Sequence, residues 1–118
     1  MVFCEAAIDA LSHAVLFPAV HTRYASIGGK LNPAKPELIR AAIARMPESA
    51  GIVGAMDADA DGAKLTEVVR GACALTGRDD LRFVAQEPFG FKDWNDQLRG
   101  RQPWLALPTA PHSVLKAG

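Results

Sequence analysis

Cysteine is scarce in this sequence. Cys4 and Cys73 are the only two cysteines among its 118 residues, and they form no CxxC pair. Zinc fingers and disulfide scaffolds depend on more cysteines at closer spacing, so the sequence argues against both classes. Two isolated thiols are typical of a protein from a reducing compartment, and we therefore expect a cytoplasmic protein.

An excess of charge is also missing. Lys and Arg together number 13, as do Asp and Glu, so the formal net charge is zero. This balance argues against binding of nucleic acid through bulk electrostatics alone, although it leaves room for a local basic strip. No segment has the length and apolar character of a signal peptide or a membrane span, and we expect no membrane association.

What the sequence does contain is an alternation of strand-like and helix-like segments. The expected strands are residues 2–4, residues 23–27, the apolar run that begins at Gly51, and residues 81–85. The expected helices are residues 6–17, a segment that opens at Pro33 or Pro36 and ends at Pro47, a segment that follows Gly62, and a short one that Asp93 caps. This alternation indicates βαβ crossovers and predicts an α/β fold with a mainly parallel sheet.

Each of the three longer helical segments carries an apolar stripe. The stripes are Ile8, Leu11 and Val15; Leu38, Ile39, Ala42, Ile43 and Met46; and Leu65, Val68, Val69, Ala72 and Leu75. We expect the second stripe to be buried and Gly77 to end the third helix.

The third expected strand leads directly into a cluster of acids. The segment 51–56 is apolar throughout, which suits a strand buried on both faces, and Asp57, Asp59 and Asp61 follow it at alternate positions before Gly62. Carboxylates at the end of such a strand lie at the edge where open α/β sheets hold their ligands. Because clustered carboxylates repel one another, a divalent cation is the usual solution, and Mg²⁺ takes one or two carboxylates together with several waters.

An EF-hand calcium loop is the competing interpretation, since Asp57 to Gly62 matches the first half of its pattern. The second half does not match. The twelfth position is Val68 rather than glutamate, the eighth is Lys64 rather than an apolar residue, and a strand rather than a helix precedes the loop. We therefore favour a magnesium site at a sheet edge.

Further acids follow other expected strands. Glu5, Asp9 and Asp93 are each placed after a strand or in the loop that follows one. Taken singly, Glu5 reads as a solvated strand end, Asp9 as an acid favoured by the helix dipole and Asp93 as a helix cap. A glycine pair, Gly28–Gly29, ends the second strand before Lys30; it suits a phosphate contact, although a plain tight turn explains it as well.

These motifs together resemble the Toprim domain of primases, topoisomerases, some nucleases and recombination proteins. They are Glu5–Ser12, Ser26–Gly29, Asp57–Gly62 and Lys92–Asp96, which occur in the right order within residues 2 to about 100. The resemblance implies a four-stranded parallel sheet flanked by helices, with Mg²⁺ (or Mn²⁺ in its place) held by Asp57 and Asp59. It makes Glu5 a metal ligand or the general acid/base.

The same resemblance implies that Asp9 and Asp93 help to hold a second ion, and that Gly28, Gly29, Lys30 and Lys92 contact phosphate or nucleic acid. Two departures bear on it. Ala6 stands where the primases usually have glycine, and Asn95 stands where they often have a second acid. The latter puts the second ion in doubt.

The ending Lys92–Asp96 most resembles the primase-like Toprim proteins of plasmids and other mobile elements. We therefore expect residues 1–101 to be a catalytic domain for DNA primase-like nucleotidyl transfer, and residues 102–118, with three prolines, to be a tail. Its partners would be DNA or RNA, nucleotides and the other domains of a larger protein. A Toprim nuclease and a non-catalytic module that uses metal only to hold its loops are the alternatives.

Overall fold

The computed structural model describes residues 1–28 and 34–101. The elements, in chain order, are β1 (Val2–Cys4), α1 (Ala7–Leu16), β2 (Tyr24–Ser26), α2 (Ala34–Ala44), β3 (Gly51–Gly54), α3 (Ala60–Leu75), β4 (Arg82–Ala85) and α4 (Trp94–Arg101). Predictions on Gly29, Lys30 and the tail 102–118 lie outside the described residues. None of the helices in the described part of the chain is long and apolar enough to cross a lipid bilayer.

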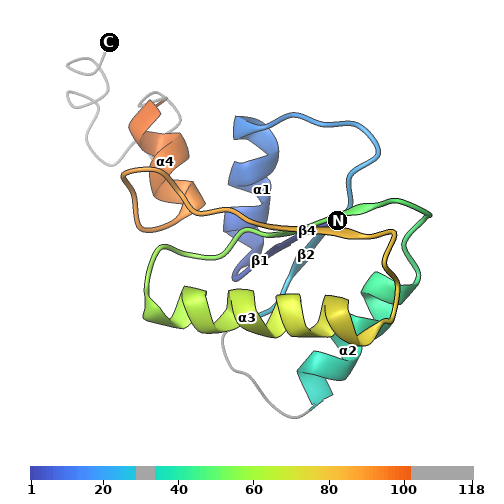
Figure 1. Ribbon diagram of the computed structural model, residues 1–118. Coiled ribbons are helices and arrows are strands. Elements are labelled where there is room, and N and C mark those ends of the chain that lie inside the picture. Colours follow the sequence, from blue (N-terminus) through green and yellow to red (C-terminus); the bar gives the residue numbers. More distant parts are fainter. Residues whose placement is uncertain (29–33, 102–118) are drawn as a thin grey trace, which may run out of the picture.

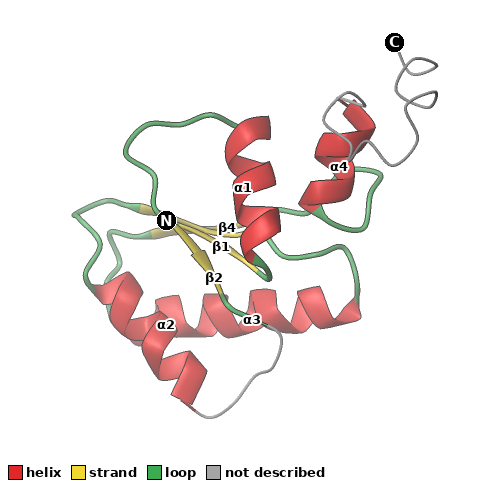
Figure 2. Cartoon of the chain, turned by 180° about the vertical axis from the view of Figure 1, so that it is seen from behind, coloured by secondary structure: helices red, strands yellow, loops and turns green. Residues whose placement is uncertain are grey.

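The four strands form one all-parallel sheet in the order β2-β1-β3-β4. Helices α1 and α4 pack against each other on one face, and α2 and α3 do so on the other (Figures 1 and 2). The predicted α/β class and the predicted four-stranded parallel sheet are therefore confirmed. All strands run the same way, so their carboxyl ends meet at a single edge of the sheet.

Strand β1 contributes side chains to the hydrophobic clusters on both faces of the sheet, because side chains alternate along a strand. Phe3 packs with the side chains of α2 and α3, whereas Val2 and Cys4 pack with Ala10 of α1 and Trp94 of α4. All three residues of β1 are buried. An interior strand covered by helices on both faces needs this continuous apolar character.

Helix α1 has the predicted apolar stripe, but the stripe faces solvent. Ile8, Leu11 and Val15 are 54%, 65% and 50% exposed, and the opposite face, which includes Asp9 and His13, is buried. Amphipathic helices of globular proteins normally bury their apolar side. Here hydrogen bonds from the polar face to other elements fix the opposite orientation.

His13 is the centre of that polar face. Its Nδ1 lies 3.1 Å from the hydroxyl of Tyr24 in β2, and its Nε2 lies 2.8 Å from Oε1 of Gln86 after β4. The ring also meets Trp94 edge to face, with centroids 4.8 Å apart. His13 therefore has a structural role, since it links α1 to β2, to the segment after β4 and to α4.

Two leucines of the predicted stripes are also exposed. Leu38 is 67% and Leu75 is 74% exposed, so the prediction that Leu38 belongs to the buried face of α2 is wrong. Leu38 lies on the flank of α2 that borders an open pocket beside Ile27. Leu75 ends a helix of 16 residues, about 24 Å long, which overruns strands of four residues.

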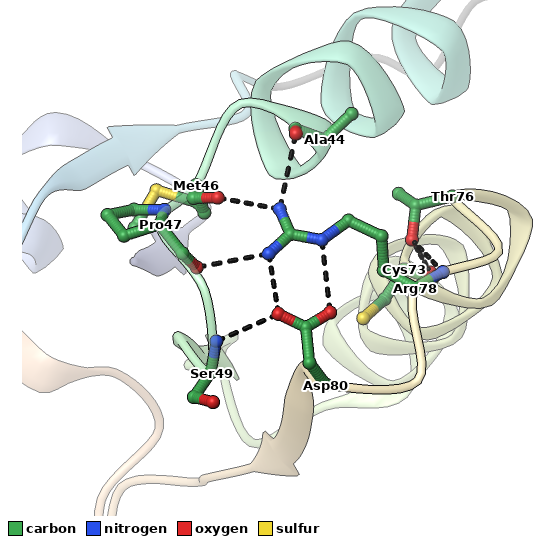
Figure 3. A network of polar contacts seen from close by, with 8 residues as sticks. All are labelled: Ala44, Met46, Pro47, Ser49, Cys73, Thr76, Arg78 and Asp80. Carbon is green, nitrogen blue, oxygen red and sulfur yellow. Dashed lines mark hydrogen bonds and ion pairs between the residues drawn. The ribbon is translucent and has the colours of Figure 1, made fainter.

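An arginine joins two loops at the amino edge of the sheet (Figure 3). The guanidinium of Arg78 donates to the carbonyl oxygens of Met46 at 2.6 Å and Pro47 at 3.1 Å, after α2. It also pairs with Asp80, which accepts a hydrogen bond from the backbone N–H of Ser49 at 2.8 Å. This network fixes the entries into β3 and β4.

Candidate functional site

Glu5 and Asp57 lie side by side at the carboxyl edge of the sheet. Glu5 follows β1 and Asp57 follows β3, and these strands are parallel neighbours. The backbone N–H of Asp57 points at Oε1 of Glu5 at 3.4 Å. Two acids that are 52 residues apart in sequence therefore share one opening because their strands end together.

Asp9 lies in the first turn of α1, and Asp93 directly precedes α4. Asp9, in the first turn of α1, is 4% exposed, and its Oδ1 accepts a hydrogen bond from the backbone N–H of Asn95 at 3.2 Å. Asp93 caps α4, because its Oδ1 accepts from the backbone N–H of Asp96 at 2.8 Å. The predicted cap is confirmed, and the amino ends of α1 and α4 meet here.

Asp59 is exposed and caps α3. Its Oδ1 accepts a hydrogen bond from the backbone N–H of Gly62 at 2.7 Å, and its own backbone is extended. The acid loop thus passes from strand β3 into a helix that it caps itself. Because a strand rather than a helix precedes Asp57, the EF-hand interpretation does not hold.

Burial and neighbouring negative charges raise the pKa values of Asp57 and Glu5. Burial, followed by the negative charges of Glu5, Asp9, Asp93 and Asp59, raises the pKa of Asp57 from 3.8 to about 7. Burial and the charges of Asp59 and Asp9 raise the pKa of Glu5, although its hydrogen bond from Asp57 opposes the rise. These shifts follow from the placement of Glu5 after β1, Asp57 after β3, Asp9 in α1 and Asp93 before α4, close enough for their charges to interact.

The same negative field acts on neighbouring groups. Burial raises the pKa of Asp9, and the charges of Asp93 and Asp96 raise it further. Burial, with the charges of Asp9 and Asp57, raises the pKa of the Cys4 thiol to about 12, so this cysteine stays protonated and unreactive.

One carboxylate oxygen at this edge is unsatisfied. Oδ1 of Asp57 is buried and has no hydrogen-bond partner among the described residues. Leaving a buried polar atom unpaired is costly, and a bound cation would remove that cost and the mutual repulsion of the acids. Asp57, with Glu5 beside it, therefore fits a divalent cation.

A full protein-made coordination sphere is not formed. Within residues 1–28 and 34–101, no three His, Cys, Asp or Glu side chains are placed to hold one metal ion together. Mg²⁺ does not require such a sphere, because it is bound through one or two carboxylates and keeps several waters. When bound, such an ion offsets negative charge on phosphate oxygens.

A sequence profile of Toprim-like domains matches residues 2–98, which covers every described strand and the first part of α4. The chain belongs to the Toprim-like family. Toprim domains process nucleic acids and generally bind Mg²⁺, in line with the acidic edge. No curated protein and no solved structure gives a significant match.

The remaining predicted residues of this Toprim domain lie at the same edge where they are described. Gly28 follows β2 with φ +84°, and its backbone N–H donates to the carbonyl oxygen of Glu5 at 2.9 Å. Lys92 is exposed, and its carbonyl oxygen accepts from the backbone N–H of Ala58 at 2.7 Å. The roles of these two residues in binding stay predictions, as do the metal and catalytic roles of the five acids.

Sequence reasoning passed over Lys35. Its Nζ lies 3.4 Å from the position that a Cβ on Gly28 would occupy, so its ammonium group stands beside the carboxyl end of β2. A lysine in the first turn of the helix after a glycine-ended strand was the available signal. It places positive charge at the edge that carries the acids.

Proposed function

We propose that this Toprim domain is the Mg²⁺-dependent catalytic part of a larger nucleic-acid-processing protein that carries out DNA primase-like nucleotidyl transfer. The observation that carries the proposal is Asp57, whose buried Oδ1 lacks a partner among the described residues while its pKa is raised to about 7. DNA or RNA and nucleotides would be its partners, in the cytoplasm. The primase-like assignment rests on the Lys92–Asp96 motif.

The chemistry assigns a role to each acid. In nucleotidyl transfer a hydroxyl oxygen bonds to the α-phosphorus of a nucleotide, the bond to pyrophosphate breaks, and the hydroxyl proton must be accepted. Asp57 and Asp59 would hold Mg²⁺, which offsets the charge on the phosphate oxygens. Glu5, with its raised pKa, would act as a metal ligand or take the proton. Asp9 and Asp93 would help with a second ion, and Gly28 and Lys92 would contact phosphate.

Calorimetric titration with Mg²⁺ tests the site. We expect Asp57→Ala or Asp59→Ala to weaken binding by tenfold or more, on the order of one lost charged ligand, while thermal unfolding stays cooperative. In the parent, affinity should fall as the pH drops below about 7, because a proton then competes for Asp57. Asp79→Asn, in the exposed loop before β4 at the opposite edge, is the matched control.

Unchanged Mg²⁺ affinity in both the Asp57 and Asp59 variants would show that the assignment is wrong. For the reaction itself, labelled single-stranded DNA is incubated with and without ribonucleotides. Chain synthesis supports the primase-like assignment, and cleavage alone supports a Toprim nuclease. If the full-length protein keeps its activity after Glu5→Gln, the domain is a non-catalytic module instead.

A further inference from the structure

The loop between β4 and α4 carries a solvent-exposed aromatic side chain. The side chain of Phe89 is 86% exposed, which is more than for any other large apolar side chain in the described part of the chain. The preceding residue, Pro88, is buried. A phenylalanine gives up the stabilisation of burial when it stands in solvent, and the exposed face of its ring is then accessible to another flat ring.

Loop flexibility does not explain this exposure, because the segment that contains Phe89 is anchored to α4. The N–H of Phe89 donates to Oε1 of Gln97 at 2.8 Å, and Gln97 is only 2% exposed. Gly90 makes a turn with φ +76°. Two residues after Phe89, the ring of Phe91 lies so close to Gly100 that an added Cβ there would meet it at 2.5 Å.

The anchored loop adjoins the acidic edge. The carbonyl oxygen of Lys92 accepts a hydrogen bond from the backbone N–H of Ala58, the residue between Asp57 and Asp59. Lys92 is exposed and adds a cation to the same loop. The loop that carries the exposed ring and Lys92 is therefore joined by a hydrogen bond to the segment that carries Asp57 and Asp59.

We propose that Phe89 is a stacking platform for an unpaired base of a single-stranded nucleic acid whose backbone passes the acidic edge, with Lys92 on its phosphate. The proposal rests on the proposed function of the acids. Stacking on an aromatic ring needs no surplus of positive charge, which suits a chain of zero net charge. Bases of a duplex are already stacked on each other, so the ring selects single strands.

Fluorescence anisotropy with a short labelled oligothymidylate in Mg²⁺ tests the platform. Phe89→Ala should weaken binding roughly 5- to 150-fold, the loss that corresponds to one base stacked on an aromatic ring. Phe89→Trp should keep the affinity and add emission that the oligonucleotide quenches. Val20→Ala is the matched control, because Val20 is 82% exposed but precedes β2 at the opposite edge of the sheet. The Val20→Ala variant should bind the oligonucleotide with the same affinity as the parent.

Three outcomes would overturn the platform: equal affinity of parent and Phe89→Ala, an equal loss of affinity for duplex DNA, or no binding of the oligonucleotide by the parent. A loss of self-association in Phe89→Ala, measured by sedimentation, would instead assign the ring to a protein contact. The Mg²⁺ titration of Asp57→Ala is separate from these measurements. The proposed function can therefore stand while the platform fails, and the two failures are distinguishable.

Discussion

Gly62 shows at the scale of one residue how tightly the acid loop is folded. A Cβ added to Gly62 would lie 1.9 Å from the carbonyl oxygen of Asp57. The N–H of the same glycine donates to Oδ1 of Asp59. A hydrogen atom is therefore all that fits between the start of α3 and the loop that carries both aspartates.

We expect Gly62→Ala to destabilise the fold by about 1–3 kcal/mol, because the added methyl group forces backbone to move. The Mg²⁺ affinity should fall with it, since the displaced backbone belongs to Asp57. Gly71 is the matched control in the same helix, with nothing within 4 Å of an added Cβ. Gly71→Ala should raise stability by about 0.5–1 kcal/mol.

Urea unfolding of the two variants, followed by circular dichroism, gives the comparison. A Gly62→Ala variant as stable as the parent would mean that the loop has slack, and that the close approach of the two backbones does not position Asp57. A stabilised Gly71→Ala variant alongside it would show that the assay resolves changes of this size.

The acids of the site were predictable from sequence because each follows an apolar run or opens a helix. The rule that parallel strands end at one edge then predicts that Glu5 and Asp57 meet, and their 3.4 Å contact confirms it. That Oδ1 of Asp57 has no hydrogen-bond partner among the described residues was not predictable, since it depends on the three-dimensional surroundings of one atom. Lys35 was missed because it lies beside Gly28 only in the folded structure, whereas a loop separates the two residues in sequence.

At the scale of elements, α1 shows what the periodicity of apolar residues cannot predict, namely which face of a helix is buried. Periodicity predicts which residues share a face, and it did so for Ile8, Leu11 and Val15. The side that is buried depends on partners that lie elsewhere in the chain. For His13 one partner, Gln86, lies 73 residues further on, and no local pattern contains that information.

The exposed stripe makes a testable difference between two leucines. Leu11→Ala should change the free energy of unfolding by less than about 0.5 kcal/mol, because its side chain is 65% exposed. Leu65→Ala should lower the free energy of unfolding by about 2–5 kcal/mol, because the side chain of Leu65 is 7% exposed and packs in the hydrophobic core beneath α3. Chemical denaturation measures both, and similar losses would mean that Leu11 is buried in solution.

At the scale of the whole molecule, the Arg78–Asp80 network connects the two crossovers of the face formed by α2 and α3. The bidentate pair and the N–H of Ser49 lower the pKa of Asp80 from 3.8 to about 2. A lowered carboxyl pKa contributes stability above the unfolded value of 3.8, and this contribution is lost as the pH falls towards 2.

Asp80→Asn should therefore have a lower melting temperature than the parent at pH 7, and the difference should shrink between pH 4 and pH 2. Thermal scans at several pH values measure it. The exposed pair of Arg40 and Glu37 provides the control, because Glu37→Gln should leave the melting temperature nearly unchanged. A difference for Asp80→Asn that stays constant down to pH 2 would contradict the role of its charge.

The position of β1 also has a consequence for how the polypeptide emerges from the ribosome. Among the four strands of this sheet, the one that comes first in sequence is an interior one, flanked by β2 and β3. Its second neighbour arrives only with residues 51–54, so one edge of a fully apolar strand stays uncovered while some fifty residues are translated. During synthesis of this domain, a fully apolar strand is therefore made well before the neighbour that covers its second edge.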